Sequence, residues 1–539
     1  MEHLQWQTVK KGYEAWLSLE FLPPDSTFVY RNSNNMTLIE PSSAICTPCG
    51  FHSDMQSHDV VIVGNVRTED YVLAGAVTAF RSLTYFTVRK RGRINGIVVH
   101  QPHIKENETP EKIVILRGND WRKLLLDYAR MAAEEMGYKP VDPDKNITGY
   151  CTWYYYYAGV TEKDFLENVD ALKKCVGSAY SPQVIQIDDG YQTFQGDWLD
   201  QDSSWPTPLR DIAAKITESG ITAGIWLMPF VCSTASRTFR EHPEWFVKNQ
   251  DGEPLVFAGW SPAPDHLWAC IDSTVKEVRD HITFVMQEFR RMGFSYFKMD
   301  GLAFGLPDGI FSDPDATPVS AFRLLMKTIR EAVPDSTLLG CTPPFMACLG
   351  FVDMCRVSND TARSWIGSKP DEDYPPDSDT ADVGIQSAWH GTVANWWKID
   401  TWFRADPDVI MARSDNAFYT AGEARISAAA GILTGVSLTS DHLGRITPDR
   451  LALLECAAKY RLKDPVPAKW MVNRWPCAFS GTTDGKKAVL FVNDSEQEMH
   501  FAFSAFGLPG ECSEKLIGLG RVTGEIVLPA HDAAFVIAE

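Results

Sequence analysis

The sequence predicts an α/β protein built on a (β/α)8 TIM barrel, with a β-sandwich before the barrel and a smaller β-sandwich after it. Three observations support this fold class. Short alternating apolar segments dominate residues 1 to about 140, short apolar strands alternate with amphipathic helices from about 147 to 460, and short strands with glycine turns return beyond Lys463. Alternating strand and helix patterns are typical of parallel βα units, and runs of short strands are typical of β-sandwiches.

The N-terminal domain, residues 1–143, is predicted to be a β-sandwich closed by one helix. Apolar residues alternate in segments such as Val60–Gly64, Ala79–Val88 and Gly96–His100, whereas Trp121–Glu135 has the pattern of a helix. The segment Pro140–Asp144 combines two prolines with two aspartates, which favours irregular structure. We therefore place the first domain boundary after residue 143.

The central domain, residues 144–462, contains eight candidate strands, a number that favours a closed barrel over an open doubly wound sheet. The region is long enough for a barrel with extended loops, and the acidic, proline-rich stretch Pro370–Asp382 is predicted to be one of them. The expected strands are Ile147–Thr152, Gln183–Asp188, Thr222–Met228, Tyr296–Asp300, Thr337–Cys341, Asp353–Val357, Val409–Ala412 and Val436–Thr439.

The C-terminal domain, residues 463–539, is predicted to be the small β-sandwich. Its apolar runs Lys487–Val492 and Glu525–Leu528 have strand patterns and are separated by glycine turns.

Charge and hydropathy exclude several classes of partner. The chain has 51 basic and 70 acidic residues, a formal net charge of −19, and no Lys/Arg-rich run that would bind nucleic acid or an anionic membrane. The first residues lack an apolar run of signal-peptide length, and no later segment approaches the ~20 apolar residues of a membrane span. We therefore expect a cytoplasmic protein without nucleic-acid or membrane partners. A homo-oligomer is compatible with the sequence.

Motifs for metal, nucleotide or serine-nucleophile chemistry are absent from the sequence. It contains no HExxH motif, no glycine-rich phosphate loop and no GxSxG motif. The 12 cysteines follow no framework pattern, and the Cys46–Cys49 pair has no second half to complete a zinc site. We expect no metal and no other cofactor.

Acidic residues follow several of the predicted barrel strands, where enzymes of this fold carry their chemistry. Lys298 lies two residues before Asp300, and Arg356 lies four residues before Asp360, so that each of these carboxylates has a cation nearby. This arrangement suits glycoside hydrolysis, in which one carboxylate attacks in its ionised form and the other donates a proton. The acidic residues at these strand ends are Asp188, Asp189, Asp300 and Asp360.

A further acidic pair, Asp406 and Asp408, flanks Pro407 just before the seventh predicted strand. Asp next to Pro is a common signal for the start of a helix. We interpret both residues as mainly structural and do not place them with the other carboxylates.

At these residues the chain resembles glycoside hydrolase family 36 and, more loosely, the related family 27; both contain α-galactosidases. The flanking β-rich regions also resemble the terminal sandwiches of the family. The matching segments run in order through the whole barrel: Cys151–Tyr157, Ile187–Tyr191 continued by Gly196–Trp198, Gly224–Pro229, His242–Trp245, Phe297–Asp300 and Arg356–Asp360.

The resemblance implies a retaining exo-α-glycosidase, in the first place an α-galactosidase acting on a small oligosaccharide or galactoside. It implies that Asp300 is the nucleophile and Asp360 the general acid/base. By the same resemblance, Lys298 and Arg356 match basic residues that contact the sugar and the nucleophile, and Asp188 and Asp189 match the pair that holds the 4- and 6-hydroxyls. Trp153 and Trp226 match residues that line the pocket. Cys341 is either a pocket residue near the 2-position or a plain buried thiol.

Departures from the family pattern keep alternatives open. Tyr191 and Met299 stand where many members carry Trp, and Gly340–Pro344 replaces the Ser-Gly-Gly-Gly loop of the better-known bacterial α-galactosidases. In this respect the chain is more similar to the raffinose-synthase-like branch. The alternatives are an α-galactosyltransferase of the raffinose-synthase type, an α-N-acetylgalactosaminidase, a non-catalytic carbohydrate-binding barrel and an unrelated metal-dependent barrel enzyme.

Overall fold

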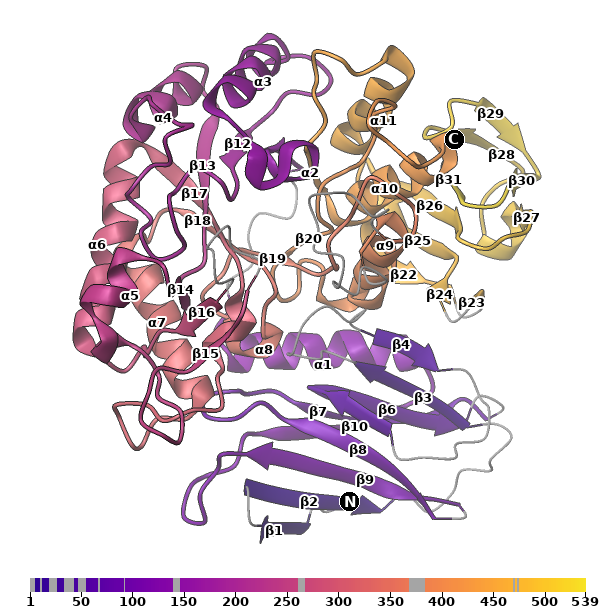
Figure 1. Cartoon of the computed structure of the whole chain (residues 1–539). Helices are drawn as coiled ribbons and strands as arrows, with labels where there is room; N and C mark the ends of the chain where they lie inside the picture. Colours follow the sequence, from indigo (N-terminus) through magenta and orange to yellow (C-terminus); the bar gives the residue numbers. More distant parts are fainter. Residues whose placement is uncertain are drawn as a thin grey trace.

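The computed structural model describes residues 5–9, 12–18, 27–32, 43–46, 55–65, 68–91, 93–138, 146–259, 267–367, 383–468, 471–472 and 475–539. Figure 1 shows the N-terminal sheets at the bottom, the barrel above them and the C-terminal strands at the right. Three predictions concern segments outside the described residues. They are the domain boundary after residue 143 in Pro140–Asp144, the loop Pro370–Asp382, and Cys49 of the Cys46–Cys49 pair.

Two five-stranded antiparallel sheets form the N-terminal region. Successive side chains of a strand point to opposite faces, so Val61 and Val63 pack with Phe86 between the sheets, whereas Val60 and Ile62 join the larger core toward the barrel. The strand order of the first sheet is β1 (Gln5–Val9), β2 (Gly12–Ser18), β9 (Arg93–Pro102), β8 (Tyr85–Arg91), β5 (Met55–His58). The strand order of the second sheet is β10 (Ile113–Gly118), β7 (Asp70–Ala76), β6 (Val60–Asn65), β3 (Thr27–Asn32), β4 (Ser43–Cys46).

Helix α1 (Trp121–Glu135) lies between the second of these sheets and the barrel, and its bounds are those predicted. On the sheet side, the Tyr128 hydroxyl donates a hydrogen bond to the Ala76 carbonyl at 2.8 Å. On the barrel side, Trp402 Nε1 donates to the Ala129 carbonyl at 2.9 Å. The helix therefore joins the N-terminal sheets to the barrel through hydrogen bonds on both faces (Figure 1).

Eight parallel strands form the barrel, which confirms the predicted fold class. The ring closes at Ile410, which pairs in parallel with Thr439 and whose N–H donates to the Leu438 carbonyl at 2.7 Å. In sheet order the strands are β20 (Arg404–Asp406), β19 (Met354–Arg356), β18 (Thr337–Gly340), β17 (Phe294–Met299), β13 (Thr222–Leu227), β12 (Val184–Ile187), β11 (Ile147–Cys151) and β21 (Val436–Thr439).

The seventh strand was placed wrongly by the sequence pattern. It is β20, Arg404–Asp406, which lies upstream of the predicted Val409–Ala412. Two of its three residues are charged, yet all three are buried, and Arg404 Nε lies 3.0 Å from Asp400 Oδ1. The ion pair with Asp400, four residues earlier in the chain, makes a polar sequence acceptable inside the barrel, and such pairing leaves no hydrophobic period for sequence analysis to detect.

Helices cover the outside of the barrel, and the amphipathic helix α6 (Lys276–Met292) turns one apolar stripe toward the strands. In α6, the buried residues Val278, Ile282, Val285 and Phe289 recur every three or four positions, and Gly293 ends the helix with a φ of 110°. In the described ranges, no helix has both the length and the apolar character needed to cross a membrane. The helices are α2 (Trp153–Tyr156), α3 (Glu162–Lys174), α4 (Leu209–Thr217), α5 (Arg237–Glu241), α6 (Lys276–Met292), α7 (Pro318–Ala332), α8 (Phe345–Cys348), α9 (Ile385–Ala394), α10 (Ala421–Thr434) and α11 (Pro448–Lys459).

The C-terminal strands pack one face on the barrel and the other on their own core. Leu490 and Phe535 join the core that includes the barrel, whereas Val489 and Val536 pack with Phe501 in a separate cluster. The strand order of the six-stranded C-terminal sheet is β22 (Lys463–Pro467), β25 (Ala478–Thr483), β26 (Lys486–Asn493), β31 (Asp532–Ala538), β28 (Glu511–Glu514), β29 (Gly520–Thr523). Two smaller C-terminal sheets pair β27 (Met499–Ala502) with β30 (Glu525–Leu528) and β23 (Met471–Val472) with β24 (Trp475–Pro476). A three-stranded sheet beside the barrel has the order β14 (Val231–Ser233), β16 (Leu267–Cys270), β15 (Val256–Ala258).

Candidate active site

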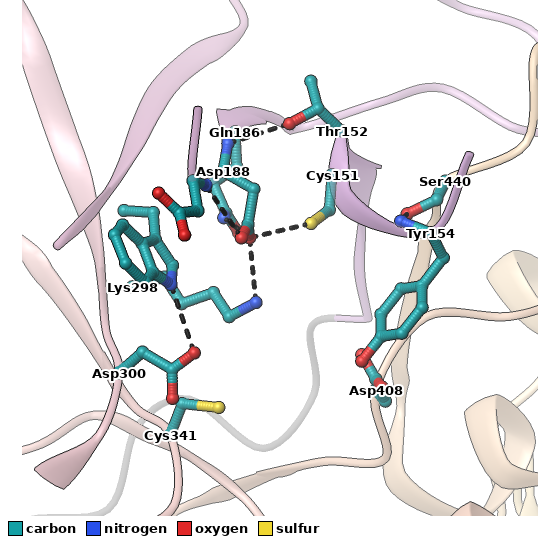
Figure 2. Close-up of polar contacts among 12 residues, drawn as sticks. Cys151, Thr152, Tyr154, Gln186, Asp188, Lys298, Asp300, Cys341, Asp408 and Ser440 are labelled. Atoms are coloured by element: carbon teal, nitrogen blue, oxygen red, sulfur yellow. Dashed lines mark hydrogen bonds and ion pairs between the residues drawn. The ribbon is translucent and has the colours of Figure 1, made fainter. Parts of the chain in front are cut away.

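The predicted site residues gather at one rim of the barrel, because parallel strands present their carboxyl ends on the same side. Asp188 follows β12, Asp300 follows β17, Cys341 follows β18, and Arg356 is the last residue of β19. Figure 2 shows Asp188, Asp300 and Cys341 close together, with Lys298 among them.

Asp300 is held by three hydrogen-bond donors. The Gly301 N–H donates to Oδ1 at 2.7 Å, the Thr342 hydroxyl donates to Oδ1 at 2.9 Å, and Trp226 Nε1 donates to Oδ2 at 3.2 Å. Burial by itself raises the pKa of Asp300, but the Lys298 ammonium and the hydrogen bonds outweigh burial, so the net pKa is lowered. Asp300 is therefore an ionised carboxylate at neutral pH.

Thr342 positions Asp300, and sequence analysis did not single it out. Its φ of 48° lies in the left-handed region, which is rare for a β-branched residue. Its carbonyl accepts the Ala303 N–H at 3.0 Å, so that both its backbone and its side chain contact the turn that carries Asp300. Strained backbone of this kind persists where the surrounding structure holds it, as it does here. The signal in the sequence was its place directly after the fifth predicted strand.

Asp360 and Arg356 form a close ion pair. Arg356 Nη2 lies 2.6 Å from Asp360 Oδ1. The Arg356 side chain is 3% exposed and the Asp360 side chain 43% exposed, so solvent reaches the carboxylate but not the cation. The Asp360 carbonyl accepts the Gly384 N–H at 3.0 Å, which ties this loop to the residue preceding α9. The structure thus brings together the cation and carboxylate that the sequence spacing paired.

Asp188 and Lys298 form a second, fully buried pair, although the sequence pattern paired Lys298 with Asp300. Lys298 Nζ donates to Asp188 Oδ2 at 2.8 Å, Gln186 Nε2 donates to the same oxygen at 2.7 Å, and the Cys151 thiol donates at 3.2 Å. Figure 2 shows these donors converging on Asp188. Burial disfavours the charged form of Lys298, but attraction to Asp188 outweighs it and raises the Lys298 pKa.

Asp189 lies beside this pair and has different partners. Gln192 Nε2 donates to Asp189 Oδ1 at 2.5 Å, and Gln195 Nε2 lies 3.3 Å from Oδ2. Both Asp188 and Asp189 are 2% exposed. Asp188 is therefore fixed by one charged donor and two neutral donors, whereas Asp189 is fixed by two neutral amide groups.

The predicted pocket residues occupy three positions on the rim. Trp226 contacts Asp300 directly, as described above, and its ring lies edge-on to Trp198 with centroids 5.9 Å apart. Trp153 begins α2, and its ring lies edge-on to Tyr157. Burial raises the pKa of the Cys341 thiol well above its usual value, so the thiol is protonated, and Arg356 Nη1 lies 3.7 Å from its sulfur.

Asp408 lies beside Arg356, although the sequence pattern did not place it with the other carboxylates. Asp406 ends strand β20, and Asp408, two residues later, has a φ of 76°. Asp408 Oδ2 lies 3.2 Å from Arg356 Nη2 and accepts the Thr361 N–H at 2.9 Å. The misplaced seventh strand hid this residue, because it put Asp408 before a strand instead of after one.

The rim thus carries an ionised, fully hydrogen-bonded carboxylate and a second, partly exposed carboxylate beside an arginine. Carboxyl groups in two such environments can divide the tasks of a nucleophile and a proton donor. In the part of the chain that the structure describes, no group of three or more His, Cys, Asp and Glu side chains is placed to hold a metal ion.

Part of the barrel matches known proteins in sequence. Residues 186–302 match the model of the melibiase family. A segment of 121 residues is 31% identical to an A type blood α-D-galactosamine galactosaminidase of Flavonifractor plautii and covers 22% of this chain and 11% of that protein. A segment of 124 residues is 27% identical to the α-galactosidase Mel36A of Lactobacillus acidophilus and covers 21% of this chain and 16% of that protein. The matched segments therefore span a small part of both relatives.

The fold as a whole matches a solved structure. An α-galactosidase from Thermus thermophilus, solved with p-nitrophenyl α-D-galactopyranoside, superposes with a TM-score of 0.66 at 20% sequence identity. The match covers 90% of this chain and 95% of that one, so the flanking sheets are included with the barrel.

Proposed function

We propose that this chain, whose barrel belongs with the α-galactosidase-like glycoside hydrolases of family 36, is a retaining exo-α-glycosidase that removes terminal α-linked galactose from oligosaccharides. The observation that carries the proposal is the presence, on one barrel rim, of ionised Asp300 and of the partly exposed Asp360 paired with Arg356. The names of the matched relatives support galactose or a galactosamine as the sugar that is released.

In the proposed mechanism, Asp300 attacks the anomeric carbon while Asp360 donates a proton to the glycosidic oxygen. The bond to the leaving group breaks as the bond to the Asp300 oxygen forms, and the leaving group departs as an alcohol. Asp360, now ionised, takes a proton from a water molecule, which attacks the same carbon and frees Asp300. Two successive inversions retain the α-configuration.

Choice of the sugar is proposed to rest on Asp188, Asp189 and Lys298. These groups are buried and fixed by hydrogen bonds, so they cannot turn to follow a hydroxyl that points in another direction. A 4-hydroxyl of glucose orientation would leave buried polar atoms unpaired, at a cost of about 1–3 kcal/mol for each group. The arrangement therefore favours the galactose configuration.

A panel of p-nitrophenyl glycosides tests the proposed activity. We expect the α-galactoside to be cleaved at least about 100-fold more efficiently than the α-glucoside, and α-galactose to be the first product seen by proton NMR. The N-acetyl-α-galactosaminide and the β-L-arabinopyranoside complete the panel. First release of β-galactose would contradict retention, and preference for the galactosaminide would favour the alternative suggested by the name of the Flavonifractor plautii relative.

A galactosyltransferase would use the same two carboxylates, with an acceptor sugar in place of water. Release of p-nitrophenol and of free galactose should be equal for a hydrolase, and adding an acceptor such as sucrose should leave them equal. If galactose falls behind p-nitrophenol and a new oligosaccharide forms, the chain is a transferase. A non-catalytic binding barrel would release neither product.

Replacing Thr342 with valine should lower kcat/KM for the α-galactoside by about 10- to 100-fold, the usual worth of a hydrogen bond to a charged group. Valine keeps the β-branched shape but removes the hydroxyl that donates to Asp300. Thr217→Val is the matched control, because its hydroxyl bonds to carbonyls within α4, away from the rim. Equal kcat/KM in the two variants would mean that Thr342 does not position Asp300.

A further inference from the structure

Arg356 is shared between two carboxylates. Its Nη2 lies 2.6 Å from Asp360 Oδ1 and 3.2 Å from Asp408 Oδ2. The side chains of Arg356 and Asp408 are 3% and 4% exposed, so their interaction is shielded from solvent, whereas Asp360 is open to it. Because Coulomb energies add, the repulsion between Asp360 and an ionised Asp408 offsets part of the attraction of Asp360 to Arg356.

Asp408 also holds the backbone next to Asp360. Its Oδ2 accepts the N–H of Thr361, the residue that follows Asp360, at 2.9 Å. Asp408 is itself fixed, because its N–H donates to Asp406 Oδ1 at 3.0 Å, and its side chain lies next to the buried Tyr154 hydroxyl. Figure 2 shows Tyr154 directed at Asp408. A single carboxylate thus contacts both the cation beside Asp360 and the peptide that carries Asp360.

Charged groups face Asp408 from several elements of the barrel. Burial raises the pKa of Asp408 to about 6; Arg356 and Lys298 act to lower it, and Asp360 and Asp406 act to raise it. Above about pH 6, Asp408 is therefore an anion that offsets the charge of Arg356. The titratable and charged groups around Asp408 are Tyr154 in α2, Lys298 in β17, Arg356 in β19, Asp360 in the loop after β19 and Asp406 in β20.

We propose that Asp408 is a positioning residue for the acid/base. It fixes the loop of Asp360, and by balancing Arg356 it allows Asp360 to keep a proton until the glycosidic bond breaks. This inference rests on the function proposed above, and specifically on Asp360 as the proton donor. A cation left unbalanced beside Asp360 would favour its ionised form, and an acid that has lost its proton cannot assist the leaving group.

The Asp408→Asn variant separates charge from shape. Asparagine keeps an oxygen for the Thr361 N–H but carries no charge, so Arg356 acts on Asp360 alone. Because the charge of Arg356 is then no longer offset, the alkaline limb of the pH profile of kcat/KM, which reports the proton donor, should move down by about 1 unit. The loss should be about 10-fold greater with p-nitrophenyl than with 2,4-dinitrophenyl α-galactoside, since the better leaving group needs no proton.

Asp353→Asn is the matched control. Asp353 pairs with Arg330 at 2.6 Å and precedes β19, so it lies at the opposite end of the same strand from Arg356. Its pH profile should superpose on that of the wild-type protein.

Two outcomes would overturn the proposal for Asp408. One is a profile of Asp408→Asn that superposes on the wild-type profile, and the other is an equal loss on both leaving groups. If Asp408→Asn does not fold, Tyr154→Phe, which removes the hydroxyl next to Asp408, decides by the same criteria with a smaller shift in the same direction. A wild-type protein that cleaves no glycoside would instead contradict the proposed function, so the two failures are distinguishable.

Discussion

Replacing Asp300 with alanine is expected to lower the turnover of every glycoside by about 10⁴-fold or more, because no covalent glycosyl intermediate can form. The variant should bind sugar with little change, since the donors around the lost carboxylate belong to Gly301, Thr342 and Trp226 and remain in place. Initial rates on p-nitrophenyl α-galactoside, measured beside the melting temperature of each variant, separate lost chemistry from lost folding.

External azide gives this prediction a distinctive readout. Azide can occupy the space of the missing carboxylate and attack the anomeric carbon once, which yields a β-galactosyl azide of inverted configuration. Proton NMR identifies the anomer, and Thr217→Val, altered away from the rim, should form no azide adduct. Substantial activity of Asp300→Ala without azide would assign the nucleophile to another group.

Replacing Asp360 with alanine is expected to slow turnover according to the leaving group. With 2,4-dinitrophenyl α-galactoside, formation of the glycosyl-enzyme needs no proton and should persist, while its hydrolysis, which needs a base, should slow. A burst of dinitrophenol should therefore precede the steady state. Poorer leaving groups should be cleaved about 10²–10⁴-fold more slowly than by the wild-type protein.

Stopped-flow absorbance with 2,4-dinitrophenyl α-galactoside and with p-nitrophenyl α-galactoside checks the role of Asp360. Equal losses on good and poor leaving groups, with no burst, would mean that Asp360 is not the acid/base. Asp408, which shares Arg356 with Asp360, would then be the first alternative to test, followed by Asp188 and Asp189.

Local sequence patterns were sufficient to predict the bounds of helices and strands whose stability comes from their own apolar face. Helix α1 was predicted over Trp121–Glu135 and is observed there, because its apolar stripe is regular and Asp120 accepts the Arg122 N–H at its start. The barrel strand Val436–Thr439 and the C-terminal strand Glu525–Leu528 were likewise predicted with their observed bounds. The position of Asp188 and Asp300 at strand ends followed from the same patterns.

The tertiary structure decided which charged groups that are distant in the chain meet. Lys298 lies two residues from Asp300 in the chain but pairs with Asp188, which is 110 residues away, because β13 alone separates β17 from β12 in the sheet. Asp408 joins Arg356 only once β20 lies beside β19. Hydrophobic periodicity records the buried face of each segment, whereas ion pairs at the rim depend on strand order and on the length of each side chain. Local patterns in the chain were therefore enough to predict the barrel, the carboxylates at its strand ends and the Arg356–Asp360 pair, whereas the closed barrel brought Lys298 to Asp188 and Asp408 to Arg356.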